Sequence, residues 1–169
     1  MSGIKDRVAI IGMGCSKFGE RWDSSASDLI VEAAYEAFED AGIEGKDIQA
    51  AWLGTVGSFR TGQPLAAALK LDYIPITRVE NACATATDAF RNACYAVAAG
   101  IYDIVLTVGV EKLKDSGFSG LAVAEPAGAD VTPPVPPPSQ FALAATRYFH
   151  QYDIPYEEGK MTLAQIAAK

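Results

Sequence analysis

Cys83 is the residue of this sequence best placed to do chemistry. It follows an apolar run that ends at Glu80, and it stands at the start of a segment of small residues that continues to Gly100. The first turn of a helix carries unpaired N–H groups and a partial positive charge, which stabilise a thiolate. The same N–H groups can bind the oxyanion that forms when a thioester carbonyl is attacked. The sequence therefore predicts a nucleophilic cysteine at a strand-to-helix turn, against the alternative of a small buried apolar residue.

The other cysteines and the single histidine are weaker candidates for a functional site. Cys94 follows Cys83 by eleven residues on the same predicted helix, about 16 Å away, so we expect it in the core. Cys15 lies in a Gly-rich loop, where we expect it to pack. His150 is the one histidine that could activate a thiol, but it falls late in an apolar helix and is predicted to be structural or on the surface. One histidine and three scattered cysteines lack the spacing of metal ligands, so no metal site is predicted.

The elements around Cys83 alternate between strands and helices. Ser25 and Asp28 form a capping-box pattern that begins a helix, and Gly42 ends it. We expect strands at Arg7–Met13, Ile48–Val56, Ile76–Glu80 and Ile104–Val110, and further helices at Pro64–Leu71, Ala84–Ala99, Ser139–Tyr152 and Met161–Lys169. This order favours an α/β sheet with helices on both faces. Gly12 and Gly14 are not a dinucleotide-binding fingerprint, because Lys17 occupies the third glycine position and no helix starts at once.

The segment around Cys83 resembles the nucleophile motif of the thiolase superfamily. In Glu80-Asn-Ala-Cys-Ala-Thr-Ala-Thr-Asp the cysteine follows an asparagine, precedes small residues and opens a long helix. The segments Gly12-Met-Gly-Cys-Ser-Lys-Phe-Gly-Glu and Tyr102-Asp-Ile-Val-Leu-Thr-Val-Gly-Val-Glu-Lys are also similar to this family. They are most similar to its sterol-carrier-protein-type branch, which includes acetyl-CoA acetyltransferases. One departure is Ala84-Thr-Ala, where many members carry Ala-Ser-Gly; it keeps the site small but alters the packing of the turn.

The resemblance implies the first half of a layered αβαβα architecture, plus the start of the loop domain that is inserted into it. Residues 1–111 would form the N-terminal thiolase-like α/β domain, and residues 112–169 a Pro-rich linker and the beginning of the helical loop domain. Five prolines between residues 133 and 138 exclude regular helix or central strand there. We therefore expect a loop over residues 112–138, stiffened by the prolines.

The resemblance also implies a reaction. Cys83 would carry an acyl group as a thioester for Claisen condensation or thiolytic cleavage, with coenzyme A thioesters as substrates and no covalently bound cofactor. The activating histidine, the second acid/base and the contacts to coenzyme A would lie outside the residues that can be assigned here. A second chain, or a complementary C-terminal half, would complete the fold. We expect a homo- or hetero-oligomer through the strand Ile76–Glu80, and a small zinc-ribbon/OB-fold protein is a further possible partner.

Two alternatives remain open at the level of sequence. The chain could be a non-catalytic subunit that binds acyl-CoA or a partner, or it could belong to a related condensing enzyme, similar to 3-hydroxy-3-methylglutaryl-CoA synthase or a retro-aldolase. The composition excludes several classes of partner. The 169 residues are 50% apolar with a net charge of −7, which argues against nucleic acid or membrane as partners. An odd number of cysteines and no apolar leader favour a reduced, cytoplasmic protein.

Overall fold

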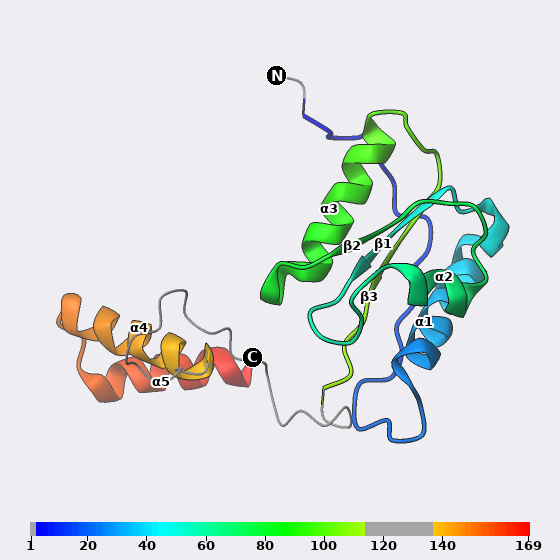
Figure 1. Cartoon of the computed structure of the whole chain (residues 1–169). Coiled ribbons are helices and arrows are strands. Elements are labelled where there is room, and N and C mark those ends of the chain that lie inside the picture. The colour runs from blue at the N-terminus through cyan, green and yellow to red at the C-terminus, as the bar shows by residue number, and fades with distance from the viewer. Residues whose placement is uncertain (1–2, 114–136) are drawn as a thin grey trace, which may run out of the picture. The chain divides into compact units, whose positions relative to one another are not determined.

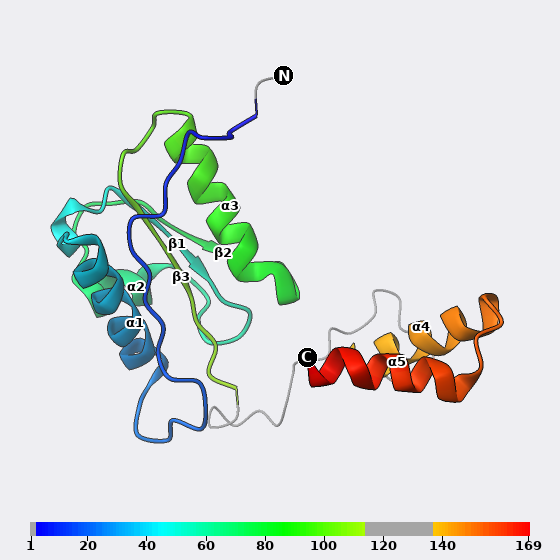
Figure 2. The same ribbon diagram turned by 180° about the vertical axis from the view of Figure 1, so that it is seen from behind.

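A parallel sheet covered on both faces forms the first part of the molecule. The computed structural model describes residues 3–113 and 137–169, which fall into two units, Met1–Gly120 and Leu121–Lys169. The first unit holds strands β1 (Ala50–Gly54), β2 (Ile76–Val79) and β3 (Val105–Gly109) in the order β2-β1-β3. Helices α1 (Ala26–Ala41) and α2 (Gln63–Leu69) cover one face and α3 (Thr85–Ala98) covers the other (Figures 1 and 2). The predicted α/β sheet with helices on both faces is confirmed.

The core lies between the sheet and the α1–α2 layer. Successive side chains of a strand point to opposite faces, and the register pairs Ala51 with Leu106 and Leu53 with Val108. These four side chains are buried together with apolar residues of α1 and α2. Leu53, on the central strand, is 0% exposed. One face of β1 and β3 therefore forms the sheet side of this core.

Helix α1 begins and ends where the sequence predicts. The Asp28 N–H donates to the Ser25 hydroxyl at 3.2 Å, and the Asp28 carboxylate accepts the Ser25 N–H at 2.8 Å. These two bonds form the expected capping box. Gly42 ends the helix at φ 68°, in the left-handed region that glycine adopts without steric cost.

The prediction of a strand at Arg7–Met13 is wrong for the described structure. The segment is not part of the sheet and instead runs along α1. From its last residue onward, alternate amides donate to carboxylates spaced by four residues on that helix: Met13 to Asp40 (2.9 Å), Cys15 to Glu36 (2.9 Å) and Lys17 to Glu32 (3.4 Å). Two extended residues advance about 6.6 Å and four helical residues about 6 Å, so the two repeats stay in step.

Gly12 and Gly14 allow this close approach. A Cβ atom at Gly12 would lie 2.3 Å from the Ala37 carbonyl oxygen, and one at Gly14 would lie 2.0 Å from that of Ala33. Both contacts are with helix backbone, which cannot move aside easily. The two glycines are therefore explained by packing against α1.

The second unit is a pair of helices, α4 (Pro137–Gln151) and α5 (Tyr156–Ala168). The aromatic ring of Phe149 packs edge-on to Tyr156, and Gly159 leaves room for it, since a Cβ there would lie 2.5 Å from the ring. No helix in the described ranges is both long and apolar enough to cross a membrane.

The ends of these two helices correct the sequence prediction. Pro137 and Pro138 lie in the first turn of α4, where a missing N–H costs nothing; their exclusion from a helix was wrong. Helix α5 begins five residues before the predicted Met161, since Glu157 and Glu158 suit a helix N-terminus. Residues 112 and 113 have no regular secondary structure, and residues 114–136 of the predicted loop lie outside the described residues. The domain boundary at residues 111/112 stays a prediction.

Candidate functional site

Cys83 lies in a short 3-10 turn, Ala82–Ala84, between the carboxyl end of β2 and the start of α3. Cys83 is exposed, and its thiol is free rather than part of a disulfide. The structure thus places the predicted nucleophile on an accessible strand-to-helix turn. The alternative of a small buried apolar residue does not fit this exposure. Its role in catalysis stays a prediction.

The turn that presents Cys83 has an unusual backbone. Ala82, the residue before the cysteine, has φ 45°, a conformation that costs a residue with a Cβ atom free energy. Its N–H donates to the Glu80 carboxylate at 2.6 Å. The hydroxyl of Thr85 donates to the Ala82 carbonyl at 2.6 Å and accepts the Asn81 N–H at 2.8 Å. The peptide groups on both sides of Ala82 are therefore held by side chains.

Two glycines let the first turn of α3 rest on the strand ends. Gly54 and Gly109 are paired at the carboxyl ends of β1 and β3. A Cβ atom at Gly54 would lie 3.2 Å from the Cα of Ala86, and one at Gly109 would lie 3.1 Å from its Cβ. The absence of side chains at these two glycines leaves room for the methyl group of Ala86. The first turn of α3 therefore packs directly against the carboxyl ends of β1 and β3.

The loop after β1 is held at the same edge of the sheet by side chains from the two flanking strands. The Glu111 carboxylate, just after β3, accepts the N–H groups of Val56 and Gly57 (3.1 Å) and the hydroxyls of Thr55 (3.1 Å) and Ser58 (3.0 Å). Arg78 of β2 donates to the carbonyls of Thr55 (2.8 Å), Val56 (3.0 Å) and Phe59 (2.9 Å). The loop after β1 and the turn that holds Cys83 therefore both lie at the carboxyl ends of the strands, and side chains of the sheet hold the loop in place.

Replacing Glu111 by glutamine should reduce stability at neutral pH. Burial opposes ionisation of Glu111, but the N–H and hydroxyl donors outweigh it and hold the pKa of this carboxyl below its ordinary value of 4.5. A lowered pKa contributes stability above pH 4.5 that is lost as the pH falls through the lower folded-state value. The Glu111→Gln protein should therefore be less stable at pH 7, and its stability should fall less steeply below pH 4.5. Urea unfolding at several pH values measures both effects.

The matched control for this measurement is Glu39→Gln. Glu39 is an exposed carboxylate of α1 whose side chain makes no hydrogen bond within the described ranges. That substitution should leave stability near neutral pH almost unchanged. Equal losses in the two variants would show that the donors around Glu111 do not stabilise its charge.

The other candidate residues lie outside the turn Ala82–Ala84 that holds Cys83. Cys94 is half-buried on α3, less buried than expected for a core residue, and Cys15 is exposed rather than packed. His150 is exposed on α4 in the second unit. Within residues 3–113 and 137–169, no three metal-ligating side chains gather. Thr85, Arg78 and Glu111 are the site residues that sequence reasoning missed.

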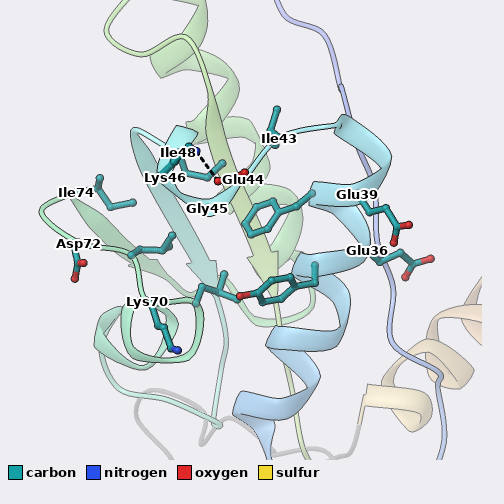
Figure 3. A pocket seen from close by; sticks show the side chains of 14 residues that line it. Glu36, Glu39, Ile43, Glu44, Gly45, Lys46, Ile48, Lys70, Asp72 and Ile74 are labelled. Atoms are coloured by element: carbon teal, nitrogen blue, oxygen red, sulfur yellow. Dashed lines mark ion pairs between the residues drawn. The ribbon is translucent and has the colours of Figure 1, made fainter.

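One pocket of about 830 Å³ lies at the other end of the strands, next to the residues that precede β1 and β2 (Figure 3). Its floor is apolar, with Phe38, Ile48 and Leu69 among its buried residues. Lys46 and Glu44 form an exposed ion pair at its rim, 2.7 Å apart, and the hydrogen bond and charge of Glu44 raise the pKa of Lys46. None of the residues that hold Cys83 lines this pocket, so it is not part of the candidate site.

Comparison with known proteins agrees with this architecture. The thiolase N-terminal domain family matches residues 8–123. An acetyl-CoA acetyltransferase from Methanocaldococcus jannaschii is 41% identical over 162 residues, which cover 91% of this chain. The sterol carrier protein 2 of Gallus gallus is 36% identical over 124 residues, which cover 69% of this chain and 23% of that protein. The chain belongs to the thiolase family.

A solved structure shows the same fold over most of the chain. The Ltp2-ChsH2(DUF35) aldolase matches with a TM-score of 0.69 at 26% identity, covering 86% of this chain and 38% of that one. The chain also spans only 41% of the length of the M. jannaschii relative. The similarity is therefore to the N-terminal portion of a thiolase.

Proposed function

We propose that this chain is the N-terminal part of a thiolase-type acyl-CoA C-acyltransferase in which Cys83 carries the acyl group. The observation that supports this most is the exposed Cys83 on a tightly held strand-to-helix turn, in a chain of the thiolase family. Related proteins bear the name acetyl-CoA acetyltransferase. The substrates would be coenzyme A thioesters, and no covalently bound cofactor is needed.

The proposed chemistry has two steps. The Cys83 sulfur attacks the thioester carbonyl of an acyl-CoA; the carbon–sulfur bond to coenzyme A breaks, and coenzyme A leaves with the proton that the cysteine gives up. The α-carbon of a second acyl-CoA, after loss of a proton to a base, then attacks the new thioester and releases Cys83. In the reverse direction coenzyme A cleaves a 3-oxoacyl-CoA. The backbone N–H of Cys83 would contribute to one oxyanion site.

The base and the activating histidine would come from outside the described residues. A C-terminal half, on the same or a second polypeptide, would supply them, since the chain matches only two fifths of its relative's length. Ile10 (63% exposed), Ile11 (54%) and Met13 (69%) form an apolar stretch beside α1, and burial of such side chains favours association. The mass of the native protein should exceed that of one 17.9 kDa chain, whereas a monodisperse monomer without exposed apolar surface would contradict this part.

Oligomerisation through β2 is part of the same proposal. β2 is an edge strand of the described sheet, so one side of its backbone has no strand partner there. An edge strand can pair with a strand of another chain. A small zinc-ribbon/OB-fold protein is a further proposed partner, and a reducing, cytoplasmic setting suits the free cysteines.

A retro-aldolase is the second candidate function. It is favoured by the match to the Ltp2-ChsH2(DUF35) aldolase, whose name joins an aldolase to a second protein. A related condensing enzyme, similar to 3-hydroxy-3-methylglutaryl-CoA synthase, uses the same fold and is a further candidate function. A non-catalytic acyl-CoA-binding subunit differs from all of these, because it would need no reactive Cys83. Substrate assays on the assembled protein separate the enzymatic candidates.

Competitive alkylation tests the role of Cys83. Iodoacetamide at near-neutral pH should modify Cys83 faster than Cys15 or Cys94, and an acyl-CoA should protect Cys83 selectively in the assembled protein. Cys15 is the matched control, because it is an exposed cysteine outside any helix. A Cys83 that reacts no faster than Cys15 and is not protected would favour the non-catalytic subunit.

A further inference from the structure

We infer that Thr85 is a positioning residue for Cys83: its hydroxyl fixes the strained turn that aims the thiol. The inference rests on the proposed function, since it concerns the reactivity of the proposed nucleophile. The residue lies two positions after Cys83, and it does not itself touch the reacting atoms. Its effect would act through the backbone on either side of the cysteine.

The hydrogen bonds of Thr85 enclose the residue that precedes the nucleophile. Its hydroxyl accepts the Asn81 N–H at 2.8 Å and donates to the Ala82 carbonyl at 2.6 Å. The Thr85 hydroxyl therefore acts both as a donor and as an acceptor within a single turn. Because Thr85 is only 6% exposed, water cannot easily replace either bond.

The hydrogen bonds of Thr85 help to hold Ala82 in an unfavourable backbone conformation. A φ of 45° is unfavourable for alanine, and such a conformation persists only where surrounding contacts hold it. The Thr85 hydroxyl and the Glu80 carboxylate, which accepts the Ala82 N–H, are the side chains that do so. Without the hydroxyl, we expect Ala82 to relax toward negative φ, which turns Cys83 away from its position at the start of α3.

A packing role is the competing explanation for a buried threonine. The Thr85 methyl group would lie 3.3 Å from a Cβ atom at Gly54, so it fills the space at the end of β1. The two explanations predict opposite orders for two substitutions. Valine keeps the shape of threonine and loses the hydroxyl, whereas serine keeps the hydroxyl and loses the methyl group.

The test compares the rate of Cys83 alkylation by iodoacetamide, over a range of pH, in the wild-type, Thr85→Val and Thr85→Ser chains. Loss of one or both hydrogen bonds should slow Cys83 in Thr85→Val by about three- to tenfold and change the pH profile of its reaction. Thr85→Ser should react close to the wild-type rate. Cys94, half-buried on the same helix, should keep its rate in all three and serves as the internal reference.

Each outcome has a distinct meaning. If wild-type Cys83 reacts no faster than Cys15 and Cys94, the proposed function fails. If wild-type Cys83 is fast and Thr85→Val is equally fast while Thr85→Ser is slower, Thr85 only packs and the inference is overturned. If Thr85→Val does not fold, as shown by a raised Cys94 rate, the comparison of Thr85→Ala with Thr85→Ser decides: equal Cys83 rates overturn the inference, and a slower Thr85→Ala supports it.

Discussion

Replacing Cys83 by alanine should abolish acyl transfer by the assembled protein, with a loss of at least about 10³-fold in turnover. The reason is that the acyl group would have no sulfur to which it can transfer, while the rest of the turn, including the Thr85 hydrogen bonds to Asn81 and Ala82, is undisturbed. Steady-state rates with an acyl-CoA pair, measured on the purified assembly, give the size of the loss.

Cys94→Ala is the control for this substitution. Cys94 lies on the same helix and is half-buried, so it tests for damage to α3 without touching the proposed chemistry. Its activity should stay close to the wild-type value. A Cys83→Ala assembly that transfers acyl groups at the wild-type rate would exclude the proposed nucleophile.

Leu53→Ala should lower the free energy of unfolding of the first unit by about 2–5 kcal/mol. Leu53 is 0% exposed on the central strand and packs with residues of α1, α2 and β3. The substitution removes that apolar contact and leaves a cavity that the surrounding sheet and helices cannot fill fully. Urea denaturation, followed by far-UV circular dichroism, measures the change.

Ile11→Ala is the matched substitution outside the core. Ile11 is 54% exposed in the described structure, so this variant should change the stability of the isolated chain by less than about 0.5 kcal/mol. In the assembled protein it should weaken association, because the same side chain would be covered there. If Ile11→Ala costs the isolated chain as much as Leu53→Ala, the apolar stretch beside α1 is not a free surface.

Local signals predicted much of the fold. Ser25 and Asp28 fix the start of α1 through two short-range hydrogen bonds, and Gly42 fixes its end by a left-handed backbone. Both depend on residues a few positions apart, so they can be recognised in the sequence. The parallel strands are visible for a similar reason, because apolar β-branched runs bounded by turns are typical of buried strands.

The segment Arg7–Met13 shows where local reasoning fails. Its apolar, β-branched pattern is that of a strand, but whether it joins the sheet depends on which groups accept hydrogen bonds from its amides. The carboxylate of Asp40, which is 27 residues further along the chain, accepts a hydrogen bond from the N–H of Met13, and Gly12 packs against the α1 backbone at Ala37. The sequence shows the acidic face of α1 but not which segment lies along it.

The sequence predicts Cys83 as the centre of the candidate site but does not predict the residues that hold its turn and the neighbouring loop. Cys83 was recognisable from its neighbours and from the resemblance to thiolases. Glu111 acts on residues more than fifty positions away, which no local pattern reveals. Thr85 is adjacent to the motif, yet its role depends on the backbone conformation of Ala82, and a sequence of small residues does not specify that conformation.

The most direct test of the proposed function is to locate the acyl group itself. The assembled protein is mixed with acetyl-CoA, quenched in acid before a second acyl-CoA can react, and digested for mass spectrometry. We predict one acetyl group, labile to hydroxylamine as a thioester is, on the peptide that contains Cys83. An active assembly that carries the acetyl group on another residue, or forms no acyl-protein at all, would contradict the assignment of Cys83 as the nucleophile.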